Sequence, residues 1–329
     1  MTVTSLRLAV QHIAFVIFVY GGHFRISLGG SIPCFSCPFV YGCGGYCYLM
    51  QFQRALGTLF VPLFTGGGTV AASVASQVWS NLENLATGFA LFAILVMVLG
   101  KTWCGWLCPF GLLQDWITGL RKKLGIRESE ILVRNKIRLS WLKYLLLAYM
   151  IILPLVASTR LISREFVLAF CNICPGKALM PLFDGNARYL AVDIDTTVAA
   201  VFSVLLLVIT SGMLVGMFFK ERFFCLFCPM LALNNLFKKL HILRLTKDPK
   251  ACHGCGNCRR TCSMDNETVY RERISSSVYD ADCMACFKCT ESCAADKVLS
   301  VKFGPFALFS STRRYAARLF AKVTHDGHA

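Results

Sequence analysis

Cysteines at ligand spacing are the residues of this chain that could do chemistry. The sequence has 18 cysteines in 329 residues. Eight of them repeat the pattern C-x2-C-x2-C-x3-C: Cys252, Cys255, Cys258 and Cys262, then Cys283, Cys286, Cys289 and Cys293. In two-cluster ferredoxins, the fourth cysteine of each run binds the cluster of the other run. We therefore expect one [4Fe–4S] cluster on Cys252, Cys255, Cys258 and Cys293, and a second on Cys283, Cys286, Cys289 and Cys262.

Zinc sites and disulfides are the alternatives for these eight cysteines. Zinc motifs rarely use this doubled spacing, and disulfides are disfavoured in a reducing compartment. The proline that usually follows the fourth cysteine is replaced by Ser263 and Ala294. This difference is expected to change the shape of the loop and the reduction potential of the cluster. It does not remove a ligand, so a cluster is still expected.

Four further cysteine pairs end in Cys-Pro, and each follows an apolar run. Proline lacks a backbone N–H, so it is expected to end or start a helix at the cysteine. The pairs are Cys34/Cys37, Cys104/Cys108, Cys171/Cys174 and Cys225/Cys228. We expect the second and fourth pairs to form an inner membrane [4Fe–4S] cluster, bound by Cys104, Cys108, Cys225 and Cys228. Aromatic neighbours would shield it from water: Trp103, Trp106, Phe224 and Phe227.

Six cysteines are expected on the outer side, and their roles stay open. Pairing by the Cys-Pro rule gives an outer cluster on Cys34, Cys37, Cys171 and Cys174, with Cys43 and Cys47 left as a disulfide or as ligands of something else. A second option is a local site on Cys34, Cys37, Cys43 and Cys47. A third combines Cys43 and Cys47 with Cys171 and Cys174. Structural disulfides in an oxidising compartment are the alternative to any cluster here.

The elements that carry these cysteines are membrane helices. The chain is 56% hydrophobic and 16% charged, and its mean hydropathy of +0.57 excludes an ordinary soluble enzyme. Four runs approach the roughly 20 residues that a bilayer needs: about 6–24, 83–100, 140–157 and 196–219. The first is expected to be retained and not cleaved as a signal peptide. The stretch 66–80 is left out of the count, and 48–64 is expected to be an interfacial helix.

The basic residues follow the predicted spans. The formal net charge is +16, and Lys and Arg crowd 121–143 and 220–250. The positive-inside rule then puts both termini and the cysteine-rich segment in the cytoplasm. Such residues suit anionic lipid or an acidic redox partner, and we expect no nucleic acid.

Two stretches of the membrane part are similar to each other. Cys108-Pro109-Phe110-Gly111-Leu112-Leu113 matches Cys228-Pro229-Met230-Leu231-Ala232-Leu233, and each is followed by a basic segment. We predict an all-α membrane domain of four transmembrane helices in two pseudo-repeats (1–245), a small α+β ferredoxin domain with two [4Fe–4S] clusters (246–300), and a basic tail (301–329).

The segment Trp103-Cys104-Gly105-Trp106-Leu107-Cys108-Pro109, the later Cys225–Pro229 and the terminal double motif resemble the NapH/NosR-type membrane polyferredoxins. The resemblance covers roughly 83–300. It implies a bacterial or archaeal cytoplasmic membrane and an electron-transfer role, as in quinol-oxidising or electron-relaying subunits of periplasmic reductase systems. The added cysteines at 34–47 and 171–174 depart from the shorter members, and they suggest clusters on both faces of the membrane.

Together these features predict an electron-transfer subunit of a membrane-bound oxidoreductase complex, not a catalytic subunit. Electrons would pass through three or four [4Fe–4S] clusters between the cytoplasmic face and a quinone or an outer-face partner. Expected partners are other subunits of the complex, a cytoplasmic ferredoxin-like or iron–sulfur protein, and an outer-face reductase, dehydrogenase or cytochrome. Alternatives are a quinol dehydrogenase working from one face and an accessory electron donor in metalloenzyme maturation.

His12 and His23 lie near one face of the first span and are candidates for a quinone contact, with packing as the alternative.

Overall fold

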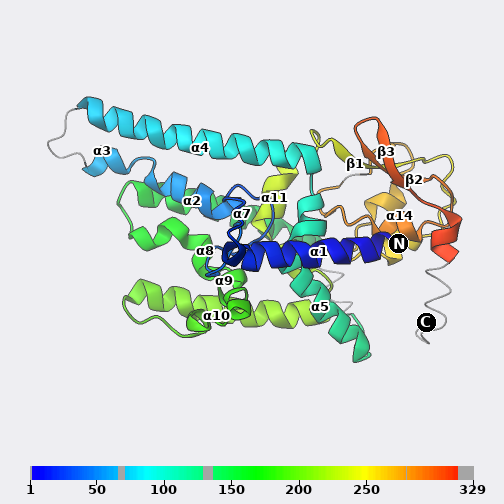
Figure 1. Ribbon diagram of the computed structural model, residues 1–329, viewed down its shortest axis with the longest axis horizontal. Helices are drawn as coiled ribbons and strands as arrows, with labels where there is room; N and C mark the ends of the chain where they lie inside the picture. The colour runs from blue at the N-terminus through cyan, green and yellow to red at the C-terminus, as the bar shows by residue number, and fades with distance from the viewer. Residues whose placement is uncertain (1, 66–70, 129–135, 279, 318–329) are drawn as a thin grey trace.

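The computed structural model describes residues 2–65, 71–128, 136–278 and 280–317. Long helices run side by side over most of its length, and a small domain with a sheet lies at one end, next to the N-terminus (Figure 1). The predicted fold class, a helical membrane domain plus a small ferredoxin domain, is confirmed. We call the end of the bundle that meets the small domain the ferredoxin side, and the opposite end the far side.

Thirteen α-helices form the described chain, and short 3-10 or π segments link several of them. The helices are α1 Val3–Tyr20, α2 Tyr48–Thr58, α3 Val61–Thr65, α4 Ala71–Leu99, α5 Pro109–Lys123, α7 Lys136–Ser158, α8 Ala169–Ile173, α9 Pro175–Leu179, α10 Thr197–Phe219, α11 Pro229–Leu236, α12 Asn257–Arg260, α13 Thr268–Arg271 and α14 Lys288–Ser292. The short segments are η1 Gly21–Phe24, η2 Trp103–Leu107, η3 Arg164–Leu168, η4 Pro181–Asp184, η5 Arg188–Leu190 and η6 Phe223–Leu226.

Four stretches of the described chain are long and apolar enough to cross a bilayer: Val3–Phe24, Ser73–Leu99, Ser140–Ser158 and Thr197–Phe219. They correspond to the four predicted spans. The second begins earlier than expected, because α4 already starts at Ala71, within the stretch that was left out of the count. The predicted interfacial helix forms α2 and α3, and α2 packs against both α4 and α7.

Two segments enter the bundle without crossing it as straight helices. The pieces Arg164–Ile173 and Pro175–Asp184 meet at 75° in a bent pair. Residues 25–47 form an irregular loop that joins α1 to α2. Backbone without regular hydrogen bonds is tolerated at membrane depth only where protein buries it or water reaches it. The loop meets this condition in part, because Gly44 N donates to Phe18 O of α1 at 3.1 Å and Cys47 N donates to Ser36 O at 3.1 Å.

The ferredoxin domain contains a three-stranded antiparallel sheet in the order β1-β2-β3. The strands are β1 Leu243–Lys247, β2 Leu299–Phe303 and β3 Phe306–Ser310. The sheet therefore includes residues before 246 and residues of the predicted tail. The end of that tail, 318–329, lies outside the described residues.

Cys-Pro dipeptides begin three of the helices. Cys108, Cys174 and Cys228 are the N-cap residues of α5, α9 and α11, and a proline follows each at the first helical position. Proline is tolerated there because that N–H has no partner within the helix. The Cys-Pro dipeptide therefore holds a thiol at the start of a helix, where the partial positive charge favours anions.

A buried ion cluster joins α1, α5 and η6 on the ferredoxin side. Asp115 accepts a hydrogen bond from Arg222 Nε at 3.0 Å and pairs with Arg7 Nη2 at 3.3 Å. The two arginine side chains are only 1–2% exposed. Burial raises the pKa of Asp115, but Arg222 and Arg7 outweigh it, so the net pKa is lowered and the carboxylate stays charged.

We expect Asp115→Asn to destabilise the chain strongly. Removing one partner of a buried ion pair typically costs about 3–5 kcal/mol, because the remaining charge stays buried. The midpoint of thermal denaturation in detergent measures this loss. Glu267→Gln is the matched control, since its partners Arg259 and Arg271 are 56% and 74% exposed and such surface pairs contribute about 0–1 kcal/mol. Equal midpoints for the two variants would contradict the importance of this cluster.

Candidate metal centres

Sixteen of the 18 cysteines line four small cavities in four sets of four, and Cys258 of the first set also reaches the second cavity. The first cavity is lined by Cys252, Cys255, Cys258 and Cys293, the second by Cys262, Cys283, Cys286 and Cys289, the third by Cys104, Cys108, Cys225 and Cys228, and the fourth by Cys37, Cys47, Cys171 and Cys174. The first three sets are the groups expected from the sequence. All 18 cysteines are described, and no two of them are joined by a disulfide.

The two ferredoxin loops wrap their cavities with the same backbone turns. Gly254 and Gly256 have positive φ in the first loop, and Ala285 and Phe287 have positive φ at the equivalent positions of the second. Alanine and phenylalanine pay a steric cost in this region that glycine does not. Packing compensates for this cost at Phe287, whose side chain is only 3% exposed.

The third cavity lies between the two matching halves of the membrane part. Amide side chains donate to two of its sulfurs: Asn234 Nδ2 to Cys104 Sγ at 3.4 Å and Gln114 Nε2 to Cys225 Sγ at 3.5 Å. Phe35 packs against its other wall, with ring centroids 5.3 Å from Phe110 and 5.0 Å from Phe224. Hydrogen bonds to sulfur and exclusion of water are two of the means by which proteins tune cluster potentials.

The fourth cavity differs in one residue from the first set that the sequence suggested. Cys47 lines it with Cys37, Cys171 and Cys174, while Cys34 does not. The fully buried Cys34 lies instead within electrostatic range of Cys108, Cys104 and Cys47. Cys43 is half-buried and faces Asp184.

Contacts on either side of Cys34 explain this arrangement. Asn234 Nδ2 donates to Pro33 O at 3.1 Å, and the Phe35 ring is held in the wall of the third cavity. These contacts fix Cys34 on the side of the third cavity. Cys47 pairs with Ile32 in a short parallel bridge, and its bond to Ser36 O places it beside Cys37. Gln53 Nε2 supports the set by donating to Cys171 Sγ at 3.3 Å.

The four cavities form a series, because each shares a lining residue with the next. Cys258 lines the first and second cavities, Met284 the second and third, and Phe35 the third and fourth. The side chain shared by two neighbouring cavities is in each case no larger than that of phenylalanine. The series leads from the surface of the ferredoxin domain into the helical bundle.

The fourth cavity lies deep in the bundle. Tyr48, the neighbour of Cys47, stacks on Phe92 of α4 with ring centroids 4.6 Å apart. At 1.5 Å per residue, Phe92 is about 10 Å from the ferredoxin-side end of α4 at Leu99 and about 30 Å from its start at Ala71. Cys47 and the three cysteines that share its cavity, all expected on the outer side, therefore lie well inside the bundle, nearer its ferredoxin side.

The residues present fit iron–sulfur clusters. Each set offers four thiols around a cavity, and no group of three or more His, Cys, Asp or Glu in the described chain is arranged around a single metal ion. Burial raises the pKa of Cys108 and Cys258 to about 11 and that of Cys283 to about 12. Ligation requires thiolates, so loading would release protons from these cysteines.

A buried lysine ties the third cavity to the second. Lys101 Nζ donates to Asn235 Oδ1 at 2.6 Å, to Asp280 O at 2.6 Å and to Ala281 O at 3.0 Å. Burial lowers its pKa to about 8, although Cys283 and Cys104 favour its charged form. Lys101 is not part of any motif in the sequence. A charge directly after an apolar span was the available signal, but its partners lie over a hundred residues away.

The two candidate histidines are not brought together. His12 Nδ1 lies 2.7 Å from Leu8 O, and its Nε2 accepts from Trp116 Nε1 at 3.3 Å. His23 follows α1 and pairs with Asp184 Oδ1 at 3.2 Å, with the ring of Tyr41 at 6.2 Å. Only His23 lies close to the loop that carries Cys37 and Cys47.

Two protein-family models match the chain. A 4Fe-4S binding domain matches residues 84–127 and again 202–247, and a 4Fe-4S dicluster domain matches residues 244–294. The double match of one model agrees with the two pseudo-repeats. Each copy contains the end of an apolar helix and the Cys-Pro pair that follows it.

Similar proteins come from bacteria and archaea. An uncharacterized protein of Methanocaldococcus jannaschii is 26% identical over 66% of this chain and 78% of its own length. The ferredoxin-type protein NapH of Haemophilus influenzae is 26% identical over 63% of this chain and 64% of NapH. The regulatory protein NosR of Stutzerimonas stutzeri is 27% identical over 60% of this chain and only 24% of NosR. No solved structure matches the chain.

We expect Gly105→Ala to disturb the junction between the second and third cavities. A Cβ at Gly105 would lie 2.5 Å from Met284 O, in the backbone between Cys283 and Cys286. Such overpacking typically costs about 1–3 kcal/mol. The cleavage rate of the ferredoxin domain in limited proteolysis and the thermal midpoint should both report it.

Gly119→Ala is the matched control, because a methyl group at this position of α5 would have no neighbour within 4 Å. Alanine in a helix interior is favoured over glycine by about 0.5–1 kcal/mol, so this variant should be unchanged or slightly more stable. A Gly105→Ala protein as resistant as the Gly119→Ala protein would refute the tight junction.

Proposed function

Since the chain belongs to the NapH/NosR-type membrane polyferredoxins and is a 4Fe-4S electron-transport protein, we propose that it carries electrons through four clusters in single file. The observation that carries this proposal is the series of four cysteine-lined cavities joined by Cys258, Met284 and Phe35. When bound, each cluster supplies one-electron redox chemistry. The chain itself holds the clusters, excludes water and sets the spacing between them.

The ligand sets follow the cavities. We assign the first two clusters as the ferredoxin motif predicts, the third to the pairs Cys104/Cys108 and Cys225/Cys228, and the fourth to Cys37, Cys47, Cys171 and Cys174. The fourth set keeps three of the cysteines first suggested and takes Cys47 in place of Cys34. Under this assignment Cys34 and Cys43 bind no iron.

The ferredoxin side is proposed to face the cytoplasm of a prokaryotic cell. Basic residues crowd 121–143 and 220–250 in the sequence, and the described segments 121–128 and 220–250 lie at this end of the spans, which suits the positive-inside rule. The ferredoxin domain and both termini would then be cytoplasmic. A soluble cytoplasmic redox protein could reach the first cluster directly.

A quinone is the exchange partner that the depth of the fourth cavity favours. The hydrocarbon core is about 30 Å thick, and Gln11 of α1 donates to Gly105 O at 3.2 Å, at the ferredoxin-side end of the spans. From Gln11 to Tyr20 the helix rises only about 13.5 Å. Cys37 and Cys47 follow shortly after and so lie near mid-bilayer. A lipid-soluble carrier can reach this depth, while an outer-face reductase, dehydrogenase or cytochrome would need a further carrier.

The pair of His23 and Asp184 supports a proton-coupled carrier at this depth. The His23 side chain is 45% exposed, and ionisable groups at membrane depth are costly and usually functional. Quinone reduction takes up two protons as well as two electrons. In this proposal His23 delivers a proton from Nδ1, while Asp184 Oδ1 holds Nε2 and orients the ring.

Iron content and cysteine variants test the ligand sets. Four clusters correspond to about sixteen irons per chain and three clusters to about twelve. We expect anaerobically purified Cys47→Ser to lose about four irons relative to wild type. Cys34→Ser and Cys43→Ser, in the same loop, should retain all of them. If Cys34→Ser lost the iron and Cys47→Ser kept it, the proposed ligands of the fourth cluster would be wrong. About twelve irons in the wild-type protein would mean three clusters, and it would favour the alternative of a quinol dehydrogenase that works from one face of the membrane.

Re-oxidation by a quinone tests the role of His23. Dithionite-reduced protein is mixed with decylubiquinone, and the return of the oxidised cluster absorbance is followed. We expect His23→Phe to slow this step by about a hundredfold, the scale of a lost general acid. His12→Phe should be much less affected, because the His12 nitrogens face Leu8 O and Trp116. Equal rates in both variants would argue against a quinone site at His23.

A further inference from the structure

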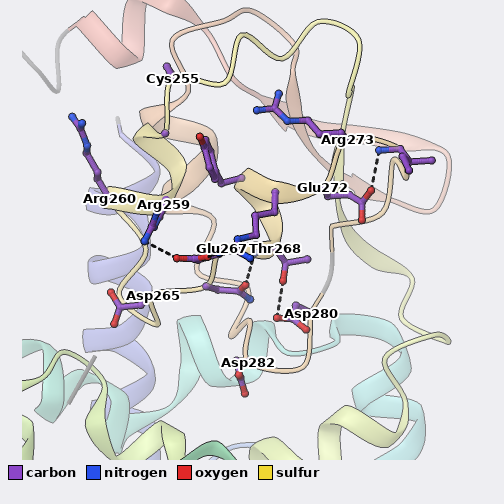
Figure 2. A pocket seen from close by; sticks show the side chains of 15 residues that line it. Cys255, Arg259, Arg260, Asp265, Glu267, Thr268, Glu272, Arg273, Asp280 and Asp282 are labelled. Atoms are coloured by element: carbon purple, nitrogen blue, oxygen red, sulfur yellow. Dashed lines mark hydrogen bonds and ion pairs between the residues drawn. The ribbon is translucent and has the colours of Figure 1, made fainter. Parts of the chain in front are cut away.

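A groove on the ferredoxin domain opens beside the first cluster site (Figure 2). It has a volume of about 1080 Å³ and is formed by α12, α13 and the segment that follows α13. Cys255 stands at its edge. Among the 18 cysteines, all of them in the described chain, Cys255 alone is exposed. The groove is therefore the place where a second molecule comes nearest to the thiols of the series.

The rim of the groove is basic. Four exposed arginines line it: Arg259, Arg260, Arg271 and Arg273. Two of them share a single carboxylate, since Arg259 and Arg271 both pair with Glu267 at 2.6 Å. Glu272 is the other carboxylate at this level of the groove, so four arginines face two glutamates and the rim is net positive.

The acidic residues at the floor are already compensated by the membrane domain. Asp265 pairs with the buried Lys220, and Asp282 pairs with the buried Lys143. Asp280 Oδ2 accepts from Thr268 Oγ1 at 2.9 Å. These floor carboxylates are part-buried and already engaged, with Asp282 20% and Asp265 29% exposed, whereas the four rim arginines are exposed. An approaching molecule therefore meets the arginines first.

An apolar side chain projects from the same rim in a fixed position. Ile274 is 93% exposed, and its backbone N–H donates to Glu272 Oε1 at 2.9 Å. Its neighbour Arg273 is anchored as well, with Nη1 donating to Cys252 O at 3.2 Å and the guanidinium 5.7 Å from the Tyr270 ring. A fixed apolar residue among arginines and a tyrosine has the composition of an interface hot spot.

We propose that this groove is the docking site of an acidic one-electron carrier protein, which exchanges electrons with the cluster held by Cys255. The proposal rests on the proposed function, because it requires a cluster in the first cavity. In the exchange, one electron leaves the reduced carrier and reduces that cluster by one electron, with no bond made or broken. The arginines steer the carrier to the groove, and Ile274 makes the short-range contact.

The test uses the full-length chain, purified with its iron, and a pre-reduced acidic [2Fe–2S] ferredoxin as the probe. Stopped-flow absorbance gives the second-order rate constant for cluster reduction at low and high salt. The rim variant is Arg260→Glu/Arg271→Glu. Arg313→Glu is the matched control, because its side chain is 75% exposed and lies outside the groove. Ile274→Ser tests the apolar contact.

We expect the rim variant to lower the rate constant at least tenfold at low salt and to lose most of the salt dependence, as for steered association. Arg313→Glu should stay within about twofold of wild type. Ile274→Ser should lower the rate constant at both salt concentrations. Rim and control variants with equal rate constants and equal salt dependence would overturn the proposal.

Two further measurements separate the other outcomes. Reduction by dithionite, a small molecule, should be the same in all variants. A wild-type chain that holds no iron or is not reduced would instead overturn the proposed function.

The experiment is repeated in nanodiscs of phosphatidylcholine with or without phosphatidylglycerol. A rim variant that differs from wild type only in the anionic discs would mean that lipid occupies the rim, and it would overturn the docking proposal.

Discussion

The series of cavities depends on the close contact between η2 and the loop that carries Cys283 and Cys286. This contact fixes the second cavity relative to the third. Gly105 lies against the backbone at Met284, Trp106 Nε1 donates to Ala285 O at 3.1 Å, and Lys101 binds Asp280 O and Ala281 O. Each contact joins a membrane residue to the backbone of the ferredoxin loop. Because the contacts are to backbone and not to long side chains, the distance between the second and third cavities has little freedom to vary. The ion pairs of Lys143 and Lys220 with the same domain reinforce that junction from the side.

The same logic extends into the bundle, where polar groups are costly unless they are paired. Amide side chains there serve two purposes at once. Asn234 binds both Pro33 O and Cys104 Sγ, while Gln53 donates to Cys171 Sγ and accepts from Phe170 N at 3.1 Å. Each amide thus satisfies irregular backbone at membrane depth and a sulfur of a cavity. The irregular loops that hold the thiols are stable in the bundle because the residues beside the thiols supply their missing hydrogen bonds.

The sequence could predict a set of cysteines where the contacts that bring them together lie close to them in the chain. Three cysteines of each ferredoxin set lie within one short loop, and the fourth comes from the other run of the same repeated motif. The spacing of the motif therefore pointed to the groups that line these two cavities. The third set was accessible through the duplicated Cys-Pro segments. The fourth was not, because Cys34, Cys37, Cys43 and Cys47 share one irregular loop without periodicity. Which of them turns toward Cys171 and Cys174 is decided by distant residues: Asn234, Phe110 and Phe224. The depth of the loop was also hidden, because a cysteine pair directly after an apolar run is expected at the membrane surface.

The position of Cys34 shows how this chain separates two neighbouring sites. On the proposed ligand sets Cys34 is a fully buried thiol that binds no iron, and such a thiol behaves as a small apolar residue. Its neighbour Phe35 lines both the third and the fourth cavity. Water there would raise the local dielectric and weaken the influence of each site on the other, while a charged residue would bias one site against its neighbour. An uncharged, tightly packed partition avoids both effects. The fixed amides and helix N-termini around each cavity are then free to set the properties of that site independently.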